Sequence, residues 1–367
     1  MTPSSEKNAD DKPGLEDLLI RPATSSDVDD FYELARLAGA GFTSLPMNKE
    51  LLSERLVATE RAFAGLPGVL MLALEDQRSK TVIGCAAVKP GGEPRPHFLN
   101  FQVSNDGQTL TTTAKYDDMT EVGSLLLHPE HRAFGVGPWL ARSRYLLIAA
   151  DVDRFGDQIF SELRGVVNED DRSPFYDGVC ARYFDCSFAD ADELCAHGLQ
   201  ADLNVCLPQE PIAIADISSD ARKAMGRPHN AGRRALDYLE REGFRFDGVV
   251  DLLDGGPAVV ARTREIKTVR STITGPLRRG QVDLEESRQA YLSVGDGAAF
   301  RCCRAPVAFK SGAFHCSDES MALLEASEGA SSRVCFVDDH AKDPDARKTP
   351  SALAHERSAA SLDAVTD

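Results

Sequence analysis

The sequence predicts an α+β protein in which helices flank a mixed β-sheet and a small antiparallel β-barrel follows. Three observations predict this class. First, residues 122–150 read as a buried strand over 122–127, a glycine loop, and a helix from Pro138 to about residue 150. Second, segments with helical periodicity precede this stretch together with short apolar strands. Third, five short apolar segments follow Gly255–Gly256–Pro257, a pattern typical of a small barrel or sandwich.

The loop of the central stretch carries the pattern Arg-x-x-Gly-x-Gly. Its residues include Arg132, Gly135, Val136 and Gly137. Glycine lets the backbone close tightly on a ligand, and N–H groups at a helix N-terminus form a ready anion site. Arg132 adds a bidentate partner for phosphate. The spacing differs from the dinucleotide and P-loop patterns, and the alternative is a glycine loop that only turns the chain.

Ahead of the central stretch, the pattern predicts a first strand, two helices, two further strands and a hairpin. Apolar residues recurring every three or four positions mark the helices, and short apolar runs mark the strands. The predicted elements are a strand at Leu18–Ala23, a helix from Ser25 or Ser26 to Ala38, a helix from Asn48 to Phe63, strands at Val69–Leu74 and Val82–Val88, and a hairpin with Asp106–Gly107 at its tip.

After the central stretch, two segments compete to be the helix that returns the chain to the sheet. Ile159–Val167 alternates like a strand. One candidate helix begins at Ser173, and the other spans Asn230–Glu242. If the second is correct, residues 173–228 are an insertion. Beyond it, strands are expected at 258–261, 266–274, 289–294, 300–309 and 333–337.

These elements predict four regions along the chain. Residues 1–16 and 338–367 are polar and are expected to be disordered tails. Residues 17–256 are expected to form the main domain and residues 257–337 the small barrel domain.

Composition excludes several classes of function. The net charge of −17 argues against a nucleic-acid surface, and an anionic ligand would need a local basic patch such as Arg132, Arg142 and Arg144. The nine cysteines contain no Cys-x-x-Cys pair, so we expect neither a disulfide framework nor a metal site. No run of 18 apolar residues and no apolar signal core occur, so we expect a cytoplasmic protein without a membrane partner.

Six ordered blocks of the sequence resemble the arginine N-succinyltransferases over roughly residues 17–337. The blocks are FTSLP at Phe42, SLLLHPEHR at Ser124, ELRGVV at Glu162, SPFY at Ser173, the His229 segment before ALDYLEREGF, and DLLDGGP at Asp251. The resemblance implies the GNAT acyltransferase fold with an added C-terminal β-barrel. It also implies succinyl-CoA as acyl donor and L-arginine as acceptor, in a homo-oligomer or a pair with a related subunit.

The resemblance also assigns roles to individual residues. It implies that the strand at Leu125 splays from its neighbour, so that the main chain of Leu125 and Leu127 binds the pantetheine arm, while the Arg-x-x-Gly-x-Gly loop holds the diphosphate. His229 is the first choice for proton transfer, because the proposed proton donor of the family falls on it and a helix N-terminus disfavours the protonated imidazole. Tyr176 and Glu162 form the alternative acid and base.

Weaker candidates and two departures from the family pattern leave alternatives open. Thr43, Ser44 and Arg164 could hold substrate carboxylates, and Asp117, Asp118 and Glu121 could meet a guanidinium. The departures, at Tyr116–Ser124 and Asn204–Cys206, leave open another amine or another acyl-CoA. A catalytically silent partner subunit is a third possibility, against which the intact loop and His229 argue.

Overall fold

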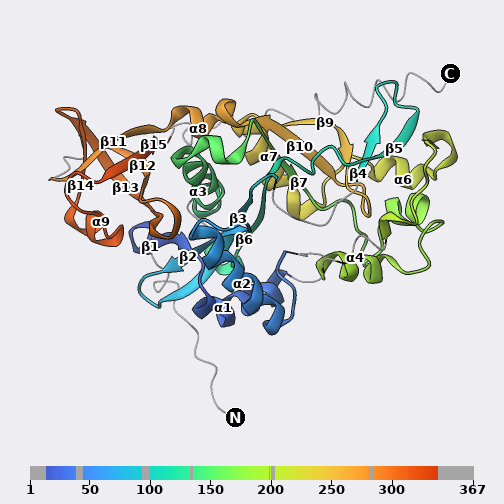
Figure 1. Cartoon of the computed structure of the whole chain (residues 1–367), viewed down its shortest axis with the longest axis horizontal. Helices are drawn as coiled ribbons and strands as arrows, with labels where there is room; N and C mark the ends of the chain where they lie inside the picture. Colours follow the sequence, from blue (N-terminus) through green and yellow to red (C-terminus); the bar gives the residue numbers. More distant parts are fainter. Residues whose placement is uncertain are drawn as a thin grey trace, which may run out of the picture.

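The computed structural model describes residues 14–38, 44–92, 100–132, 135–197, 199, 203–280 and 285–337. A long mixed sheet runs through these residues, with a barrel at one end and a second group of helices at the other (Figure 1). Both predicted tails lie outside the described residues except for Gly14 to Glu16, and Leu15 and Glu16 belong to a short 3₁₀ turn.

The main part of the sheet contains ten strands among the described residues. All neighbours are antiparallel except β6 and β7, which are parallel. In spatial order they are β1 (Leu18–Pro22), β2 (Leu70–Asp76), β3 (Thr81–Lys89), β6 (Thr120–Leu127), β7 (Gln158–Glu162), β10 (Pro257–Arg262), β9 (Arg245–Val250), β4 (Asn100–Val103), β5 (Thr109–Thr113) and β8 (Ile212–Ala213).

Helices cover both faces of this sheet, and the alternation of β2 shows how. Leu70, Leu72 and Leu74 join the apolar cluster that contains residues of α3 (Val136–Ala150), α7 (Arg233–Glu242) and α8 (Lys267–Ser271). Met71 and Ala73 point the other way, toward α1 (Val28–Ala38) and α2 (Lys49–Phe63). Successive side chains of a strand face opposite sides, so the continuous apolar run of β2 is buried on both faces.

A second hydrophobic core lies at the end of the sheet away from the barrel (Figure 1). It joins residues of β4, β5 and β9 to α4 (Phe188–Ala196), α6 (Ser219–Ala224) and a π-helix, Tyr176–Cys180. The chain returns from this core through α7 into β9 and β10, and β10 pairs with β7. The Asn230–Glu242 segment is therefore the helix that leads back to the sheet, and the Ser173 segment belongs to the inserted core.

The C-terminal strands close into a barrel. Its circuit runs β12 (Arg288–Val294), β15 (Ser331–Phe336), β11 (Ile273–Arg279), β14 (Ala313–Cys316), β13 (Arg301–Lys310) and back to β12. Helix α9 (Asp318–Leu323) contributes Met321 to its core. The predicted barrel is confirmed, but β11 and β14 are parallel, so it is not wholly antiparallel. Pairing of Ile20 with Cys302 joins the barrel to the main sheet.

Three local predictions were wrong. The strand at 258–261 belongs to the main sheet between β7 and β9 rather than to the barrel. Residues 267–271 form α8 rather than a strand, because the amide of Thr268 is held by the carboxylate of Glu242 on α7 at 2.8 Å. Helix α3 begins at Val136, two residues before Pro138. The division at residue 257 stays a prediction.

Short 3₁₀ turns complete the described connections. They are Leu15–Asp17, Ser25–Asp27, Pro129–His131, Val152–Phe155, Ile214–Asp216, Asn230–Gly232, Thr263–Glu265 and Gly297–Ala299.

Candidate active site

The parallel strands β6 and β7 pair only at their beginnings. The register joins Thr120 with Ile159 and Glu121 with Phe160, and within the described chain no strand pairs with this edge of β6 beyond Glu121. We call this gap in the pairing the β6–β7 opening. It lies near the centre of the molecule, beside α3 and α7 (Figure 1). The predicted splaying of the strand that carries Leu125 is therefore observed.

A β-bulge in β6 lies alongside the opening. The pairing of β6 with β3 shifts register between Gly123 and Leu126, so that Ser124 and Leu125 lie opposite a single residue of β3. Ser124 has φ of +51°, which L-residues adopt rarely, and its buried hydroxyl has no hydrogen-bond partner among the described atoms. Such bulges redirect side chains and interrupt pairing, so Ser124 and Leu125 depart from the regular ladder with β3.

The loop after β6 and the start of α3 fit an anion. Arg132 is exposed, and its Nε donates to the carbonyl of Leu127 at 3.1 Å, which holds the guanidinium next to β6. Gly135 precedes α3 with φ of +83°, a conformation that favours glycine. A Cβ added to Gly137 would meet no heavy atom of the described residues within 4 Å, so among these residues nothing fills the space over the first turn. The side chain of Val136 is buried, so only its main chain can contribute.

Glu162 ends β7 in acid-rich surroundings. Burial, and after it the carboxylates of Asp251 and Glu121, raise the pKa of its carboxyl group from 4.5 to about 8. A hydrogen bond from the Asn100 side chain and the Lys89 ammonium oppose this rise. The Oε1 atom is buried and has no hydrogen-bond partner in the described part of the chain. A carboxyl group that changes protonation near neutral pH suits general acid–base catalysis.

His229 is held on the β6 side of the segment that extends β7. The amide of Leu163 points toward β10 and donates to the carbonyl of Pro257, the first residue of that strand, at 3.1 Å. Peptide groups of a strand alternate between its two neighbours, so the next carbonyl, that of Arg164, faces the β6 side. That carbonyl accepts the N–H of His229 at 2.7 Å. His229 therefore lies beside the β6–β7 opening.

The imidazole of His229 also caps the helical segment that follows it. Its Nδ1 accepts the N–H of Ala231 at 3.3 Å, so the neutral ring carries its proton on Nε2. The residue lines a pocket of about 380 Å³, which we call the basic pocket. Its lining comprises Val166, Val167, Pro174, Asp220, Lys223, Ala224, Arg227, Pro228, His229, Asn230 and Arg233.

Arg164 is occupied by carboxylates of the protein itself. Its two terminal nitrogens bind Asp192 at 2.6 and 3.1 Å, and its Nε lies 3.3 Å from Asp254. Burial raises the pKa of Asp254 well above its usual range. The guanidinium also lies over the ring of Phe188, 5.0 Å from its centroid. With every edge of the guanidinium in use, Arg164 stabilises the fold rather than holding a substrate carboxylate.

Comparison with known proteins agrees with this arrangement. The family model described as arginine N-succinyltransferase beta subunit matches residues 18–268. An arginine N-succinyltransferase of Yersinia enterocolitica is 32% identical over 298 residues, which cover 76% of this chain and 85% of that relative. The beta subunit of the Pseudomonas aeruginosa enzyme is 34% identical over 268 residues, covering 69% of this chain and 78% of the subunit. The chain belongs to the arginine N-succinyltransferase family.

A solved structure supports the same assignment. The arginine/ornithine succinyltransferase subunit AI from Pseudomonas aeruginosa matches with a TM-score of 0.77 and 26% identity, covering 88% of this chain and 99% of that subunit. The family resemblance and the fold class predicted from the sequence, an α+β acyltransferase fold with an added barrel, are confirmed. This arginine N-succinyltransferase family member is accordingly an acyltransferase.

Tyr176 occupies a structural position in this family member. Its ring is buried in the second core, next to Phe184 and Phe188. Its hydroxyl donates to the carbonyl of Cys186 at 2.9 Å. Because the hydroxyl already satisfies a buried carbonyl, its surroundings give no support to the predicted role in proton transfer.

Two of the cations expected to form a basic patch are engaged inside the protein. The Nε of Arg142 binds Glu242 at 2.7 Å. Arg144 is buried and donates to the carbonyls of Ala141 and Gly123, at 3.0 and 3.4 Å. Of the patch expected from the sequence, Arg132 alone is exposed. The cations of the basic pocket were missed, although Arg227 and Arg233 flank His229 in the sequence.

The weaker acceptor candidates are only partly placed. Thr43 lies outside the described residues, and the carbonyl of Ser44 accepts a hydrogen bond from Arg55 at 3.0 Å. The carboxylate of Glu121 forms an ion pair with Lys89 at 2.7 Å. Its negative charge also raises the pKa of Glu162. Asn100 was missed because only the pairing of β4 with β9 brings it to this region.

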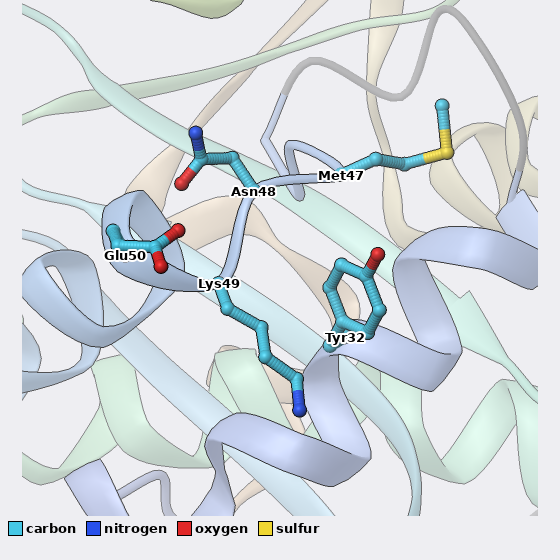
Figure 2. A pocket seen from close by; sticks show the side chains of 5 residues that line it. All are labelled: Tyr32, Met47, Asn48, Lys49 and Glu50. Carbon is cyan, nitrogen blue, oxygen red and sulfur yellow. The ribbon is translucent and has the colours of Figure 1, made fainter.

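A second pocket lies where α2 begins, close in sequence to Ser44. It measures about 440 Å³ and is lined by Tyr32 and residues 47–50 (Figure 2). Lys49 points along α1, where its ammonium lies 2.6 Å from Asp29 and 5.3 Å from the ring centroid of Tyr32. The lysine charge is thereby balanced within the protein, and the pocket brings no acid and base together.

Neither a membrane-spanning helix nor a metal-binding cluster occurs in the described ranges. No helix in them has the length and apolar character needed to cross a membrane. No group of three or more histidine, cysteine or acidic side chains in them is arranged to hold a metal ion.

Proposed function

We propose that this protein transfers a succinyl group from succinyl-CoA to the α-amine of L-arginine, releasing CoA. The observation that carries the proposal is the β6–β7 opening, flanked by the anion loop before α3 and by the two titratable groups Glu162 and His229. The relatives named arginine N-succinyltransferase support the choice of donor and acceptor.

In this proposal the main chain and the loop bind the donor. The amides of Val136 and Gly137, at the positive end of α3, and the guanidinium of Arg132 hold the diphosphate. The interrupted edge of β6 near Leu125 and Leu127 takes the pantetheine arm. Backbone donors there also stabilise negative charge on the thioester oxygen.

Glu162 is proposed as the general base. Attack on the thioester needs an unprotonated amine, and a carboxylate whose pKa lies near 8 can accept the proton that the amine loses. The neighbouring carboxylates of Asp251 and Glu121 make this side of the opening attractive to a guanidinium, which suits arginine as the acceptor.

His229 is proposed as the proton donor to the leaving thiolate. Nδ1 accepts the Ala231 amide, so the neutral ring holds one proton, on Nε2. As the thiolate takes this proton, Nε2 regains one from Glu162, which holds the proton removed from the amine, so the net transfer runs from the amine to the thiolate. The His229 amide is bound to the carbonyl of Arg164, two residues beyond Glu162, so the proposed acid and base lie at the same end of β7. Tyr176 takes no part in this scheme.

The test is a thiol-release assay with succinyl-CoA and L-arginine, followed by mass spectrometry of the product. We expect arginine-dependent release of CoA and a succinylated α-amine. Acetyl-CoA and agmatine, which lacks the carboxylate of arginine, serve as the matched alternative donor and acceptor. Absence of arginine-dependent release would refute the proposal, and a preference for acetyl-CoA would assign a different donor.

Two of the relatives are named as subunits of an enzyme. The assay must therefore also determine whether this chain needs a second subunit for activity. We propose that the chain functions as an oligomer, either with itself or with a related chain. Activity of the isolated chain, measured together with its mass in solution, decides between the two. An isolated chain that is inert but gains activity with a paralogue would identify a paired subunit.

A further inference from the structure

The basic pocket gathers positive charge in a chain whose net charge is −17. Lys223 of α6 lines it, together with the two arginines that flank His229, Arg227 and Arg233. The ammonium of Lys223 lies 3.3 Å from the carboxylate of Asp220, which partly balances it. The guanidinium groups of Arg227 and Arg233 form no hydrogen bond or ion pair with any described residue. Two arginines without a counterion at one pocket favour an anionic ligand, and guanidinium geometry matches a carboxylate.

The basic pocket adjoins the reacting end of the donor. His229 lines the pocket, and its amide is bonded to the Arg164 carbonyl beside the β6–β7 opening. In the proposed reaction, Nε2 of the same imidazole gives its proton to the thiolate, so the sulfur lies within hydrogen-bond reach of this residue. The diphosphate, on the loop before α3, is at the other end of the pantetheine arm. The pocket is therefore placed to meet the acyl group rather than the nucleotide.

A succinyl group brings an anion to this position. Three carbon atoms separate its free carboxylate from the sulfur of the thioester, so the carboxylate extends about 5 Å beyond the sulfur. The pocket, of about 380 Å³, has room for such a chain. The apolar side chains of Val166, Val167 and Pro174 also line it and suit the two methylene groups between the carbonyl and the carboxylate.

The surroundings of Glu162 would repel the same carboxylate. The carboxylates of Asp251 and Glu121 raise the pKa of Glu162, which marks this part of the site as negative. The guanidinium of Arg164 is bound by carboxylates of the protein itself and cannot compensate. The charge of the site is thus divided: the acid-rich part suits the cationic acceptor, and the basic pocket suits an anionic acyl chain.

We infer that Arg227 and Arg233 bind the terminal carboxylate of the succinyl group and so select succinyl-CoA over donors whose acyl chain is uncharged. The identity of the ligand rests on the proposed function. A guanidinium binds a carboxylate through two parallel hydrogen bonds, so the pair contributes affinity and also fixes the orientation of the acyl chain. Both arginines are specificity-determining residues, whereas His229 acts on the sulfur. Lys223 adds a third positive charge to the pocket.

The test uses two unreactive thioethers, carboxypropyl-CoA and butyl-CoA, whose chains differ only in ending with a carboxylate or a methyl group. Isothermal titration calorimetry of the full chain should give a Kd about tenfold lower for carboxypropyl-CoA, as charge-assisted hydrogen bonds predict. In Arg227→Met/Arg233→Met the Kd for carboxypropyl-CoA rises until the two ligands bind alike, while the Kd for butyl-CoA is unchanged. Arg241→Met removes one exposed cation of α7 outside the pocket and is the control.

Several results would overturn the inference. Equal binding of the two thioethers by the wild-type protein does so without any variant. Another is an equal loss of affinity for both ligands in a double variant whose far-UV circular dichroism matches that of the wild type. A double variant that keeps the preference for carboxypropyl-CoA but has a raised KM for L-arginine would assign the pocket to the acceptor. L-Argininamide, which lacks the charge of the acceptor carboxylate, identifies that case because its KM would then not respond to the substitutions.

The outcomes also separate this inference from the proposed function. Succinyl transfer to arginine by a protein that binds the two thioethers equally leaves the function standing and removes the inference. A preference for carboxypropyl-CoA that depends on Arg227 and Arg233, without succinyl transfer to arginine, supports the carboxylate site and rejects the reaction.

Discussion

Replacing Glu162 by glutamine tests the central electrostatic feature of the site. The pKa of this carboxyl rises from 4.5 to about 8 on folding, first because of burial and then because of Asp251 and Glu121. Below pH 4.5 the group is protonated in both states. Between 4.5 and about 8 the unfolded chain ionises while the folded chain keeps its proton, so stability falls as pH rises; above about 8 the loss is complete.

The magnitude follows from the separation of the two pKa values. At about 1.4 kcal/mol per pKa unit, the full loss amounts to roughly 5 kcal/mol, of which about 3 kcal/mol falls between about pH 5.5 and 8.5. Glutamine keeps the shape but cannot ionise. The free energy of unfolding of Glu162→Gln, relative to wild type, should therefore rise by about 3 kcal/mol across that interval.

Urea denaturation of both proteins at a series of pH values measures this difference, because the other titrating groups are common to both. The same substitution should lower kcat by about 10² to 10⁴ and remove the rise of the rate toward pH 8. A difference in unfolding free energy that stays constant with pH would show that Glu162 titrates normally. A variant that keeps its rate and its pH profile would show that Glu162 is not the base.

Three further substitutions address the neighbouring features. Arg164→Met should destabilise the fold by about 1 to 3 kcal/mol in urea denaturation, because Asp192 and the buried carboxyl of Asp254 lose their bonds to its guanidinium. Gly137→Ala should stabilise α3 by about 0.5 to 1 kcal/mol yet raise the Kd of CoA about tenfold, because its methyl group occupies the open space over the first turn. Tyr176→Phe should lower stability by about 1 kcal/mol through loss of its bond to the Cys186 carbonyl and leave kcat unchanged.

Each of these has an outcome that contradicts it. Arg172→Met, which breaks an exposed pair with Asp177, is the control for Arg164 and should change stability by less than about 1 kcal/mol; an equal effect of both would deny the role of burial. Unchanged CoA affinity in Gly137→Ala would place the diphosphate elsewhere. A large drop in kcat for Tyr176→Phe would return that hydroxyl to the mechanism.

Local pattern determined much of the architecture. Helical periodicity and short apolar runs located α1, α2, β2 and β3, and the Arg-x-x-Gly-x-Gly spacing located the loop that leads into α3. Such features depend on residues a few positions apart, which share one face of a helix or one turn. The six sequence blocks that resemble the arginine N-succinyltransferases predicted the acyltransferase fold, and the comparisons confirm it.

The sequence by itself therefore located α1, α2, β2 and β3, the glycine loop that leads into α3, and the position of His229 before a helix. Tertiary structure alone decided that residues 257–262 pair with β7, that Arg164 is held by Asp192 and Asp254, and that Glu162 ionises near neutral pH. Strand pairing, ion pairs and burial join residues distant along the chain. A local pattern records which face of a segment is apolar but not which partner will cover it, and a pKa depends on that partner.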